Sequence, residues 1–376
     1  SLRMKETLRD GDTLARMGGD EFVAVLAGLV DVEDSLPVLD RLLLATSEPI
    51  RVGDVVIHIS ASIGVTLYPK GGLDADMLMR HADQAMYLAK KAGKNCYHLF
   101  DTAHDAAVNN QRESLDKISV GLDRREFVLY YQPKVNMSTG KIVGVEALIR
   151  WQHPVRGLVP PLDFLPIIEG HAMSLAIGEW VMNTALSQIS QWQSLGLTLP
   201  ISVNISGHQL QQTDFVTRLE ALLASHPDVL PDHFELEVLE TSILTDINHI
   251  STTMDACRGL GVQFALDDFG TGYSSLTHLR RLPANLIKID QSFVRDMLVD
   301  PDDLAIIEGV ISLAKAFQRD VIAEGVETIE HGTTLLQLGC KLAQGYGIAR
   351  PMPANDIPEW VKSWKPDDEW LRANDK

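Results

Sequence analysis

From Arg125 onward, short apolar segments alternate with segments long enough to form a helix, and the alternation continues to near the end of the chain. The apolar segments read FVLYYQP, IVGVEALIRW, PISVNIS, FELEVLE, VQFALDD, NLIKID, DVIAEGVE and LAQGYGI. Eight strands that alternate with helices predict an α/β fold, a (β/α)8 barrel of the TIM type. Only a short turn around residues 138–140 joins the first two strands, whereas a parallel crossover needs about a dozen residues. The first strand should therefore run antiparallel to the second.

Each predicted strand ends with a polar residue, and barrel enzymes build their active sites at the rim where the parallel strands end. In chain order these residues are Gln132, Glu146, Asn204, Glu237, Asp267 with Asp268, Lys288, Glu324 and Gln344. The five carboxylates among them would repel each other at one mouth unless a divalent cation lay between them. Hard oxygen ligands with one amide favour Mg²⁺ or Mn²⁺, and the lack of His and Cys in the set argues against zinc.

Seven ordered motifs carry a family resemblance. They are EALIR at Glu146, NISGHQ at Asn204, ELEVLE around Glu237, DDFGTGYSSL from Asp267, KID at Lys288, AEGVE at Glu324 and QGY at Gln344. Over about residues 113–364 the chain resembles the EAL family, bacterial phosphodiesterases that act on cyclic di-GMP. Upstream, RMGGDEF resembles the GGDEF family of diguanylate cyclases and covers only the second half of that domain.

The EAL resemblance implies two divalent cations, Mg²⁺ or Mn²⁺, in one site. One cation would be held by Glu146, Asn204, Glu237 and Asp267. Asp267 would bridge to the second cation, with Asp268 as a further ligand. Ca²⁺ is expected to bind but to inhibit, because its longer and looser coordination would misplace the water.

The same resemblance assigns roles to the remaining residues. Lys288 and Glu324 would position and deprotonate the attacking water, and Gln344 would complete the pocket. Arg150 would pair with a substrate phosphate, and Gln132 would also contact the substrate. The product implied is linear pGpG.

Glu240 is implied to act without touching a metal. It would anchor the loop Asp-Asp-Phe-Gly-Thr-Gly, whose glycines at 270 and 272 allow local motion. We therefore expect Glu240 to affect catalysis through the position of this loop.

The domain boundaries follow from the point near Arg125 where apolar segments begin to alternate with helix-length segments. We expect a truncated GGDEF domain over residues 1–104, a helical linker over 105–117, the EAL barrel over 118–364 and a tail over 365–376. The first segment reads as α/β, with a hairpin at Gly18-Gly19, a helix over 32–46, a strand pair within 55–69 and an amphipathic helix that begins near residue 75 and stops near Gly93.

The GGDEF-like segment keeps only some of the cyclase residues. By resemblance, Glu21 would be a cyclase metal ligand beside Asp20, and Gly18 with Gly19 would admit the nucleotide. In addition, Arg9 and Asp12 match the Arg-x-x-Asp of the family's inhibitory product site. The strand that should carry the other metal-binding aspartate and the phosphate loop is missing from this sequence, so we expect this chain not to synthesise cyclic di-GMP.

Composition limits the partners and the compartment. Lys and Arg total 33 against 51 Asp and Glu, a formal net charge of −18, which lacks the basic surface of a protein that binds a nucleic-acid polymer. The three cysteines are far apart in the sequence and fit reduced thiols in the cytoplasm. No apolar run approaches the roughly 20 residues of a membrane span.

The sequence also indicates what lies beyond it. It has no initiator Met and begins inside a pattern already under way, so we expect a fragment of a longer protein. The upstream part of that protein could carry a membrane or sensor region. A homodimer through the EAL domain is a further expectation.

Alternative interpretations exist both for single residues and for the function of the chain. An isolated Asp-Asp before Gly-x-Gly most often forms a turn or a cap, and Lys288 alone could pair with Asp290 or form a Schiff base. Arg150 could pair with a surface carboxylate instead of a phosphate. The main alternative function is a receptor that binds cyclic di-GMP without cleaving it. Such receptors in this family have usually lost metal ligands or the lysine, all of which this sequence keeps.

Overall fold

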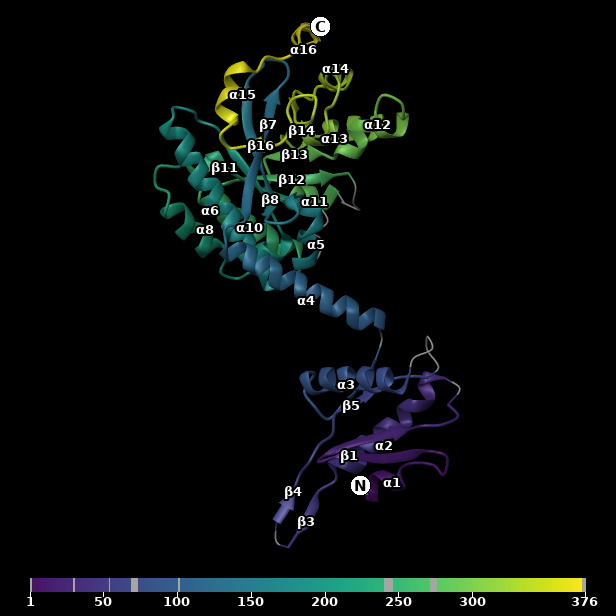
Figure 1. Ribbon diagram of the computed structural model, residues 1–376. Helices are drawn as coiled ribbons and strands as arrows, with labels where there is room; N and C mark the ends of the chain where they lie inside the picture. The colour runs from purple at the N-terminus through teal and green to yellow at the C-terminus, as the bar shows by residue number, and fades with distance from the viewer. Residues whose placement is uncertain are drawn as a thin grey trace. The chain divides into compact units, whose positions relative to one another are not determined.

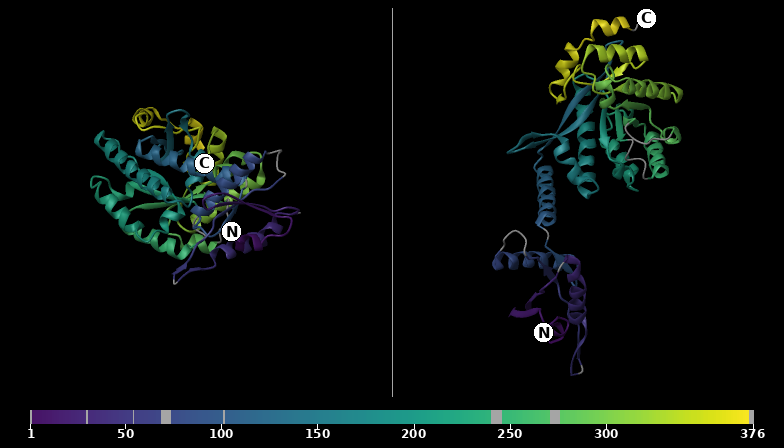
Figure 2. Two further views of the ribbon diagram at one scale, coloured as in Figure 1. Left: turned by 60° about the horizontal axis from the view of Figure 1, so that its bottom comes forward. Right: turned by 90° about the vertical axis from the view of Figure 1, so that its right-hand side faces the viewer.

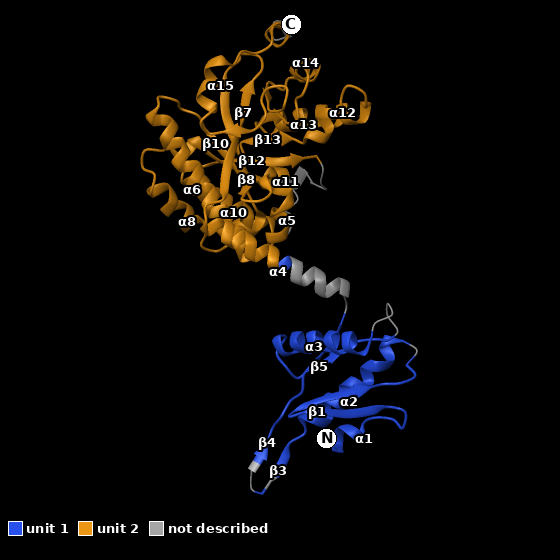
Figure 3. Cartoon of the chain, viewed as in Figure 1, with its two compact units in different colours: residues 1–112 blue, residues 113–376 orange. Residues whose placement is uncertain are grey.

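The computed structural model describes residues 2–29, 31–53, 55–68, 74–100, 102–239, 246–270 and 276–373. The chain divides into two compact units, residues 1–112 and 113–376, which are drawn in blue and orange in Figure 3. Each unit is described by itself below. None of the described helices is long and apolar enough to cross a membrane.

Unit 1 is a small α/β unit whose described strands pair two by two. Its elements are α1 Leu2–Glu6, β1 Thr13–Gly18, β2 Glu21–Val25, η1 Val32–Ser35, α2 Leu36–Ser47, β3 Ile50–Val52, β4 Val55–Ile57, β5 Ile63–Val65, α3 Ala75–Lys91 and β6 Tyr97–Leu99. The predicted hairpin is confirmed, because β1 and β2 pair antiparallel across a turn in which Gly19 has a φ of +55°. The two predicted helices correspond to η1 with α2 and to α3.

The prediction of a strand pair within residues 55–69 is wrong. Both strands exist, but β4 pairs antiparallel with β3, and β5 pairs parallel with β6. The connection HISAS at residues 58–62 contains no Gly, Pro or Asn, so nothing there favours a tight turn. Instead β5 packs closely on α3, where a Cβ on Gly64 would lie 1.8 Å from the carbonyl oxygen of Ala82.

Unit 2 is a closed barrel with helices around it (Figures 1 and 2). The barrel strands are β7 Phe127–Asn136, β8 Ile142–His153, β10 Ile201–Ile205, β11 Phe234–Leu239, β12 Gln263–Phe269, β13 Leu286–Ile289, β14 Asp320–Ala323 and β15 Leu342–Ala343. Two short strands, β9 Gly157–Val159 and β16 Met352–Pro353, extend the sheet from β8 and β7.

The described helical elements associated with this unit connect or cover these strands. They are α4 Thr102–Asp123, η2 Pro161–Asp163, α5 Leu165–Ile168, α6 Ala172–Ser194, α7 Gly207–Leu210, α8 Phe215–Ala224, η3 Pro231–His233, α10 Ile247–Gly259, α11 Leu276–Arg281, α12 Gln291–Asp296, α13 Pro301–Ala316, α14 Ile329–Leu338, α15 Ile357–Ser363 and α16 Asp368–Ala373. Helix α4 includes the division between the units at residue 112. Helix α16, within the expected tail, buries Trp370 against Gly332 of α14.

The predicted eight-stranded barrel with an antiparallel first strand is confirmed. The strand order is β7-β15-β14-β13-β12-β11-β10-β8, and the pairing of β8 with β7 closes the ring. Strand β7 is antiparallel to both of its barrel neighbours, β8 and β15, and the other neighbours pair parallel. All the parallel strands therefore end at one rim.

The turn between β7 and β8 explains the reversed strand. Asn136 accepts hydrogen bonds at Oδ1 from the backbone N–H groups of Ser138 and Thr139, at 3.1 and 3.2 Å. Gly140, with a φ of +71°, donates its N–H to the carbonyl oxygen of Asn136. This side-chain-stabilised turn brings the chain back after a few residues, which leaves no room for a crossover helix.

The barrel interior is layered because residues two apart on a strand face the same side. Ala265, Leu286 and Ile322 form a buried apolar cluster with Leu342, one residue from each of the consecutive strands or strand ends β12 to β15. Two residues further along lie Asp267, Lys288, Glu324 and Gln344. The apolar cluster is thus a floor on which a polar layer stands, and that layer faces the rim.

Candidate active site

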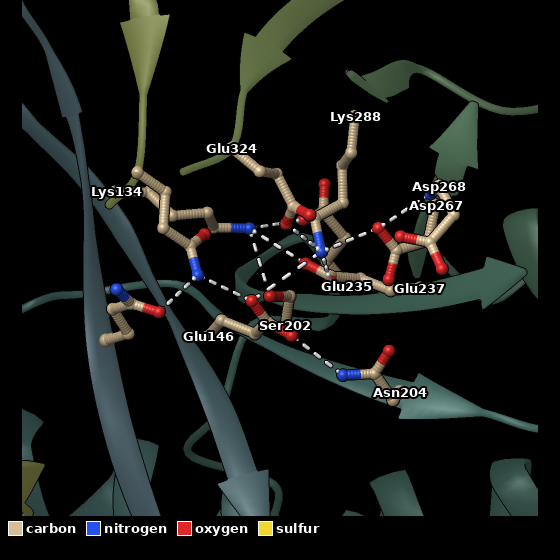
Figure 4. Close-up of polar contacts among 12 residues, drawn as sticks. Lys134, Glu146, Ser202, Asn204, Glu235, Glu237, Asp267, Asp268, Lys288 and Glu324 are labelled. Carbon is tan, nitrogen blue, oxygen red and sulfur yellow. Dashed lines mark hydrogen bonds and ion pairs between the residues drawn. The ribbon is translucent and has the colours of Figure 1, made fainter. Parts of the chain in front are cut away.

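Eight polar side chains, one from each barrel strand or its end, form a connected ring at the rim, which we call the polar ring (Figure 4). Its members are Gln132, Glu146, Asn204, Glu237, Asp267, Lys288, Glu324 and Gln344. The period of two along the strands places these side chains inside the barrel, and the parallel register of β10 to β15 brings them to one level.

Lys288 lies at the centre of the polar ring and is buried on β13. Its Nζ lies 3.5 Å from Glu146 Oε2, 3.0 Å from Asp267 Oδ1 and 2.7 Å from Glu324 Oε1. It also pairs with Glu237 Oε2. An ammonium has three N–H donors, so four carboxylates offer more acceptors than it can satisfy at once. Burial alone would lower the pKa of Lys288, but these carboxylates outweigh burial and raise that pKa well above its ordinary value.

Amide side chains hold the other side of the ring. Asn204 donates from Nδ2 to Glu146 Oε1 at 2.7 Å, and Gln344 donates from Nε2 to Glu146 Oε2 at 2.6 Å. Gln344 Nε2 also donates to Gln132 Oε1 at 3.0 Å, and Gln132 donates to the carbonyl oxygen of Ala349. Glu146 is therefore fixed by two amides and by Lys288, with both carboxylate oxygens engaged.

A local break in β12 lets two adjacent carboxylates serve the same site. In a regular strand Asp267 and Asp268 would face opposite sides of the sheet. Here the register of β12 against β13 shifts between Leu266 and Phe269, and Asp268 has a φ of +53°. Its backbone N–H donates to Asp267 Oδ1 at 3.0 Å. An aspartate tolerates this left-handed conformation better than most residues, and the strained turn directs the second carboxylate toward the rim.

The crowding of carboxylates changes their proton affinity. Burial raises the pKa of Glu146 to about 7 and that of Glu324 to about 8, although Lys288 opposes both shifts. Burial and then the charge of Asp267 raise the pKa of Asp268 to about 7. One buried ammonium is therefore too little positive charge for this many acidic groups.

Two groups of described carboxylates are close enough to share a cation. Glu146, Glu237 and Asp267 form one group, and Asp267, Asp268 and Glu324 form the other, with the ligand oxygens of each group within 4.8 Å of one another. Asp267 belongs to both. Carboxylate oxygens, with the amide of Asn204 beside them, are the donors that Mg²⁺ and Mn²⁺ prefer, so this donor set fits two divalent cations.

A cavity of about 240 Å³ opens on the polar ring. Its lining includes Lys288 and Glu324 from the ring, together with Arg150, Gln291 and Tyr346. A second observation marks this cavity as a binding site. Gln344, which also lines it, has a buried Oε1 that accepts no hydrogen bond from any residue the structure describes. A buried, unsatisfied carbonyl oxygen is costly unless a ligand or water completes it.

The comparisons with known proteins agree with this geometry. The model of the EAL domain family matches residues 115–351, and the model of the diguanylate cyclase GGDEF domain matches residues 1–96. The chain belongs to the EAL domain family. A partial GGDEF domain precedes the EAL domain, as the sequence motifs predict.

Two curated relatives match nearly the whole chain. One is the bifunctional diguanylate cyclase/cyclic di-GMP phosphodiesterase MucR of Pseudomonas aeruginosa, 38% identical over 94% of this chain and 52% of MucR. The other is the cyclic di-GMP phosphodiesterase PdeR of Escherichia coli, 35% identical over 97% of this chain and 55% of PdeR. The chain thus spans about half the length of these relatives.

A solved structure is also similar. The PaMucR phosphodiesterase in complex with c-di-GMP superimposes with a TM-score of 0.63 at 39% sequence identity. The match covers 65% of this chain and 99% of that structure. The EAL domain described here therefore has the fold of nearly all of that solved chain.

The structure brings the predicted site residues of the EAL domain together. The eight ring residues meet as described, and Asp268 joins them through the break in β12. Arg150 lines the cavity and is half-buried; its guanidinium donates to the carbonyl oxygen of Ile149 and lies 5.9 Å from the ring centroid of Tyr130. Glu240 and residues 271–275 lie outside the described residues, so the predicted tether is untested.

The predicted GGDEF residues lie in unit 1 on the surface. Gly18, Gly19, Asp20 and Glu21 are exposed at the β1–β2 turn. The Asp12 carboxylate accepts hydrogen bonds from the backbone N–H groups of Arg9 and Ala27, at 3.0 and 3.1 Å. These contacts are of the kind that order a loop. Both groups of described carboxylates that could share a cation lie in the EAL domain.

Sequence reasoning missed a second buried lysine in the EAL domain. Lys134, on β7, contacts Ser202, Glu235 and Glu237 inside the barrel (Figure 4). Burial alone would raise the pKa of Glu237, but Lys288 and Lys134 outweigh burial and hold that pKa at about 2. A signal for Lys134 does exist in the sequence, because it lies two residues from a ring residue, as Ser202 and Glu235 do.

Proposed function

We propose that the EAL domain hydrolyses cyclic di-GMP to linear pGpG. The observation that carries this proposal is the polar ring, in which carboxylates that could hold two cations surround a lysine beside a cavity. Family membership supports the substrate, since MucR and PdeR are named as cyclic di-GMP phosphodiesterases.

The donor set determines which residues would hold the cations. Glu146, Asn204, Glu237 and Asp267 would bind one, and Asp267 with Asp268 would bind the second. Two bound Mg²⁺ or Mn²⁺ ions would supply positive charge that favours ionisation of the attacking water and stabilises the attacking and leaving oxygens of an in-line displacement.

The chain's own residues then handle water and substrate. Glu324 lies beside Lys288 at the cavity and would accept a proton from the attacking water once bound cations keep its carboxylate ionised. Lys288 would hold that water in line with the scissile bond. The water oxygen forms a new bond to phosphorus, the bond from phosphorus to the 3′ oxygen breaks, and a proton passes to that oxygen. The product keeps the 5′ phosphate, which is linear pGpG.

Other cavity residues would orient the substrate. Arg150 would pair with a phosphate, because its half-buried guanidinium faces little competing solvent. Gln344 would offer its unsatisfied Oε1 to the bound ligand, and Gln132 would keep Gln344 in place through their hydrogen bond.

Glu240 has a separate proposed role, in tethering the loop that follows Asp268. If it anchors this loop, Glu240→Ala should weaken metal binding, and the defect in turnover should shrink at high Mg²⁺. A loss of about 10- to 100-fold at low Mg²⁺ is typical for a residue that supports a metal ligand. Mg²⁺ titrations of activity that superimpose for wild type and Glu240→Ala would show that the loop needs no such anchor.

One experiment tests the proposed function directly. The protein is incubated with cyclic di-GMP and Mg²⁺ or Mn²⁺, and the products are separated by chromatography. We expect pGpG to form, to disappear with a chelator and to return when Mg²⁺ is restored, while Ca²⁺ supports little turnover. Full activity in excess chelator would refute the two-metal mechanism. Tight binding of cyclic di-GMP without pGpG would support the receptor alternative.

Two expectations accompany this proposal. The predicted domain boundaries at 104, 117 and 364 would be tested by limited proteolysis, which cuts exposed segments first. Dimerisation through the EAL domain would be tested by light scattering at several protein concentrations.

A further inference from the structure

Lys134 lies one step below the polar ring. Because β7 runs antiparallel to β8, Lys134 is two residues after the ring residue Gln132 and points into the barrel at the level of the floor. From there its Nζ crosses the barrel to β10 and β11. It donates to Ser202 Oγ at 3.0 Å, Glu235 Oε1 at 2.7 Å and Glu237 Oε1 at 3.3 Å.

These contacts leave Lys134 no capacity for chemistry. An ammonium has three N–H donors, and three acceptors occupy them, so this buried charge is fully satisfied. Lys288, in contrast, has four carboxylate partners and lines the cavity. Lys134 is not among the described residues that line that cavity. Its role must therefore act through a neighbour.

Glu237 is the neighbour that links the two lysines. Its Oε1 accepts from Lys134, and its Oε2 pairs with Lys288 (Figure 4). The carboxylate is completely buried, and its rotation is fixed by one lysine on each side together with a hydrogen bond from Ser202. When a cation binds, Oε2 would be the oxygen left to coordinate it, since Oε1 stays tied to Lys134.

We propose that Lys134 is a positioning residue that orients Glu237 for metal binding. This inference rests on the proposed two-cation site. The layer beneath the polar ring, to which Lys134 belongs, would then hold one metal ligand, Glu237, in a single orientation. Residues that support a metal ligand in this way typically contribute about 10- to 100-fold to metal affinity or activity.

Charge and orientation make opposite predictions for the loss of Lys134. Removing a positive charge makes the site more negative, which by itself would strengthen cation binding. Removing the hydrogen bond frees Glu237 to rotate, which would weaken cation binding. A double variant separates the two effects. In Lys134→Met/Glu235→Gln one positive and one negative charge are lost together, so the net charge of the cluster stays at the wild-type value while the bond to Glu237 is gone.

The experiment measures Mn²⁺ binding to the full chain by isothermal titration calorimetry, with pGpG formation measured across Mn²⁺ concentrations as a second readout. We expect the dissociation constant for Mn²⁺ to rise about 10- to 100-fold in the double variant, with kcat at saturating Mn²⁺ changing much less. Lys141→Met, an exposed lysine beside the β7–β8 turn, is the matched control and should bind Mn²⁺ as wild type does. Glu235→Gln alone keeps an oxygen that accepts from Lys134 but loses one negative charge, so we expect a loss of Mn²⁺ affinity smaller than that of the double variant.

Wild-type Mn²⁺ affinity in the double variant would overturn the proposal and show that Lys134 only balances charge. Ser202→Ala provides a milder test if the methionine variants do not fold, since Ser202 holds Lys134 and also hydrogen-bonds to Glu237, so its loss loosens the same carboxylate. We expect a smaller loss of Mn²⁺ affinity there, and an unchanged affinity would count against the proposal. Calorimetry keeps this test separate from the proposed function: Mn²⁺ binding can weaken as predicted even if no pGpG forms.

Discussion

The two units of this chain use their strands differently. In unit 2 every barrel strand is paired on both sides, and the closed sheet has a continuous core beneath its helices. In unit 1 the described strands pair two by two. The buried apolar side chains among the described residues of unit 1 are Val38, Leu39, Leu42, Ala85 and Ala89. Isolated two-stranded sheets are marginally stable, so we expect unit 1 to be the weaker of the two.

The difference between a closed barrel and isolated two-stranded sheets explains why several carboxylates can lie close together in unit 2. Five carboxylates can be held within a few ångströms only if the backbone beneath them cannot move apart, and a closed barrel provides that constraint. The acidic residues of the β1–β2 turn in unit 1, Asp20 and Glu21, are exposed and flank a two-stranded sheet.

Lys288→Ala should reduce kcat by about 10²- to 10⁴-fold, because it removes the group that positions the water. Loss of this ammonium makes the site more negative, so metal binding should persist and saturating Mg²⁺ should not restore turnover. The matched variant in unit 1, Glu21→Ala, should leave pGpG formation unchanged. Steady-state kinetics of Lys288→Ala and Glu21→Ala test these two expectations. An unchanged kcat with a raised KM for Lys288→Ala would contradict its assigned role.

Arg150→Ala should raise KM by about 10- to 100-fold, because a charged hydrogen bond to a phosphate is worth roughly 1.5–3 kcal/mol. The effect on kcat should be smaller, since the arginine contacts the phosphate both before and during the reaction. KM and kcat for cyclic di-GMP are measured at saturating Mg²⁺. A loss confined to kcat would mean that Arg150 acts on the transition state.

Removing metal should make the stability of the barrel depend on pH. The pKa values of Glu146 and Glu324 in the folded chain, about 7 and about 8, lie above their ordinary value of 4.5. Groups whose pKa is raised by folding add stability at low pH and lose it as pH rises through the folded pKa. With chelator, the melting temperature of the barrel should therefore fall from about pH 5 upward and level off above about pH 8, so that it is lower at pH 9 than at pH 6.

Tryptophan fluorescence measures this transition in the barrel alone, because all six tryptophans lie in unit 2. Saturating Mg²⁺ should flatten the dependence, since the cations replace the protons. Glu237 does not make the melting temperature depend on pH in this range, because its pKa of about 2 keeps it ionised throughout. Equal melting temperatures at pH 6 and pH 9 in chelator would contradict the crowding of carboxylates that the structure shows.

Leu39→Ala should have the smallest effect on activity. Truncation of a buried leucine costs about 2–5 kcal/mol, so unit 1 should lose its helical circular dichroism at a lower temperature. The tryptophan signal and pGpG formation should stay at wild-type values. A parallel drop in the fluorescence transition would show that the two units unfold together.

The sequence predicts the barrel and its rim because two periodic signals agree. Strand-length apolar segments recur at helix-length intervals, and each carries a polar residue within it or at its end, such as Glu146 or Lys288. The short connection at residues 138–140 also predicts the antiparallel β7. Chain geometry alone decides these features, so no long-range information is needed.

Other features depend on contacts that no local pattern contains. The partner of β5 could not be predicted, because its pairing with β6 depends on where α3 packs. The pairing of β4 with β3, by contrast, does have a local signal, the Gly-Asp pair at residues 53–54 between two apolar segments. The role of Lys134 depends on Glu235 and Glu237, about 100 residues away in the sequence. The left-handed backbone at Asp268 is equally hidden, since Asp-Asp before Phe-Gly is compatible with a regular strand as well.

The pairing of β7 with β15 has a consequence for how the barrel folds during synthesis on the ribosome. Strand β7 pairs at once with β8, but its other neighbour is β15, where Asn136 pairs with Leu342. About 200 residues separate them, and ribosomes add about 5–20 residues per second, so β7 waits roughly 10–40 s for its second partner. During that interval its edge is open, and for about the first half of it the inward-facing Lys134 lacks its partners on β10 and β11. A chaperone that shields strand edges should therefore improve the yield of this domain more than one that acts after release.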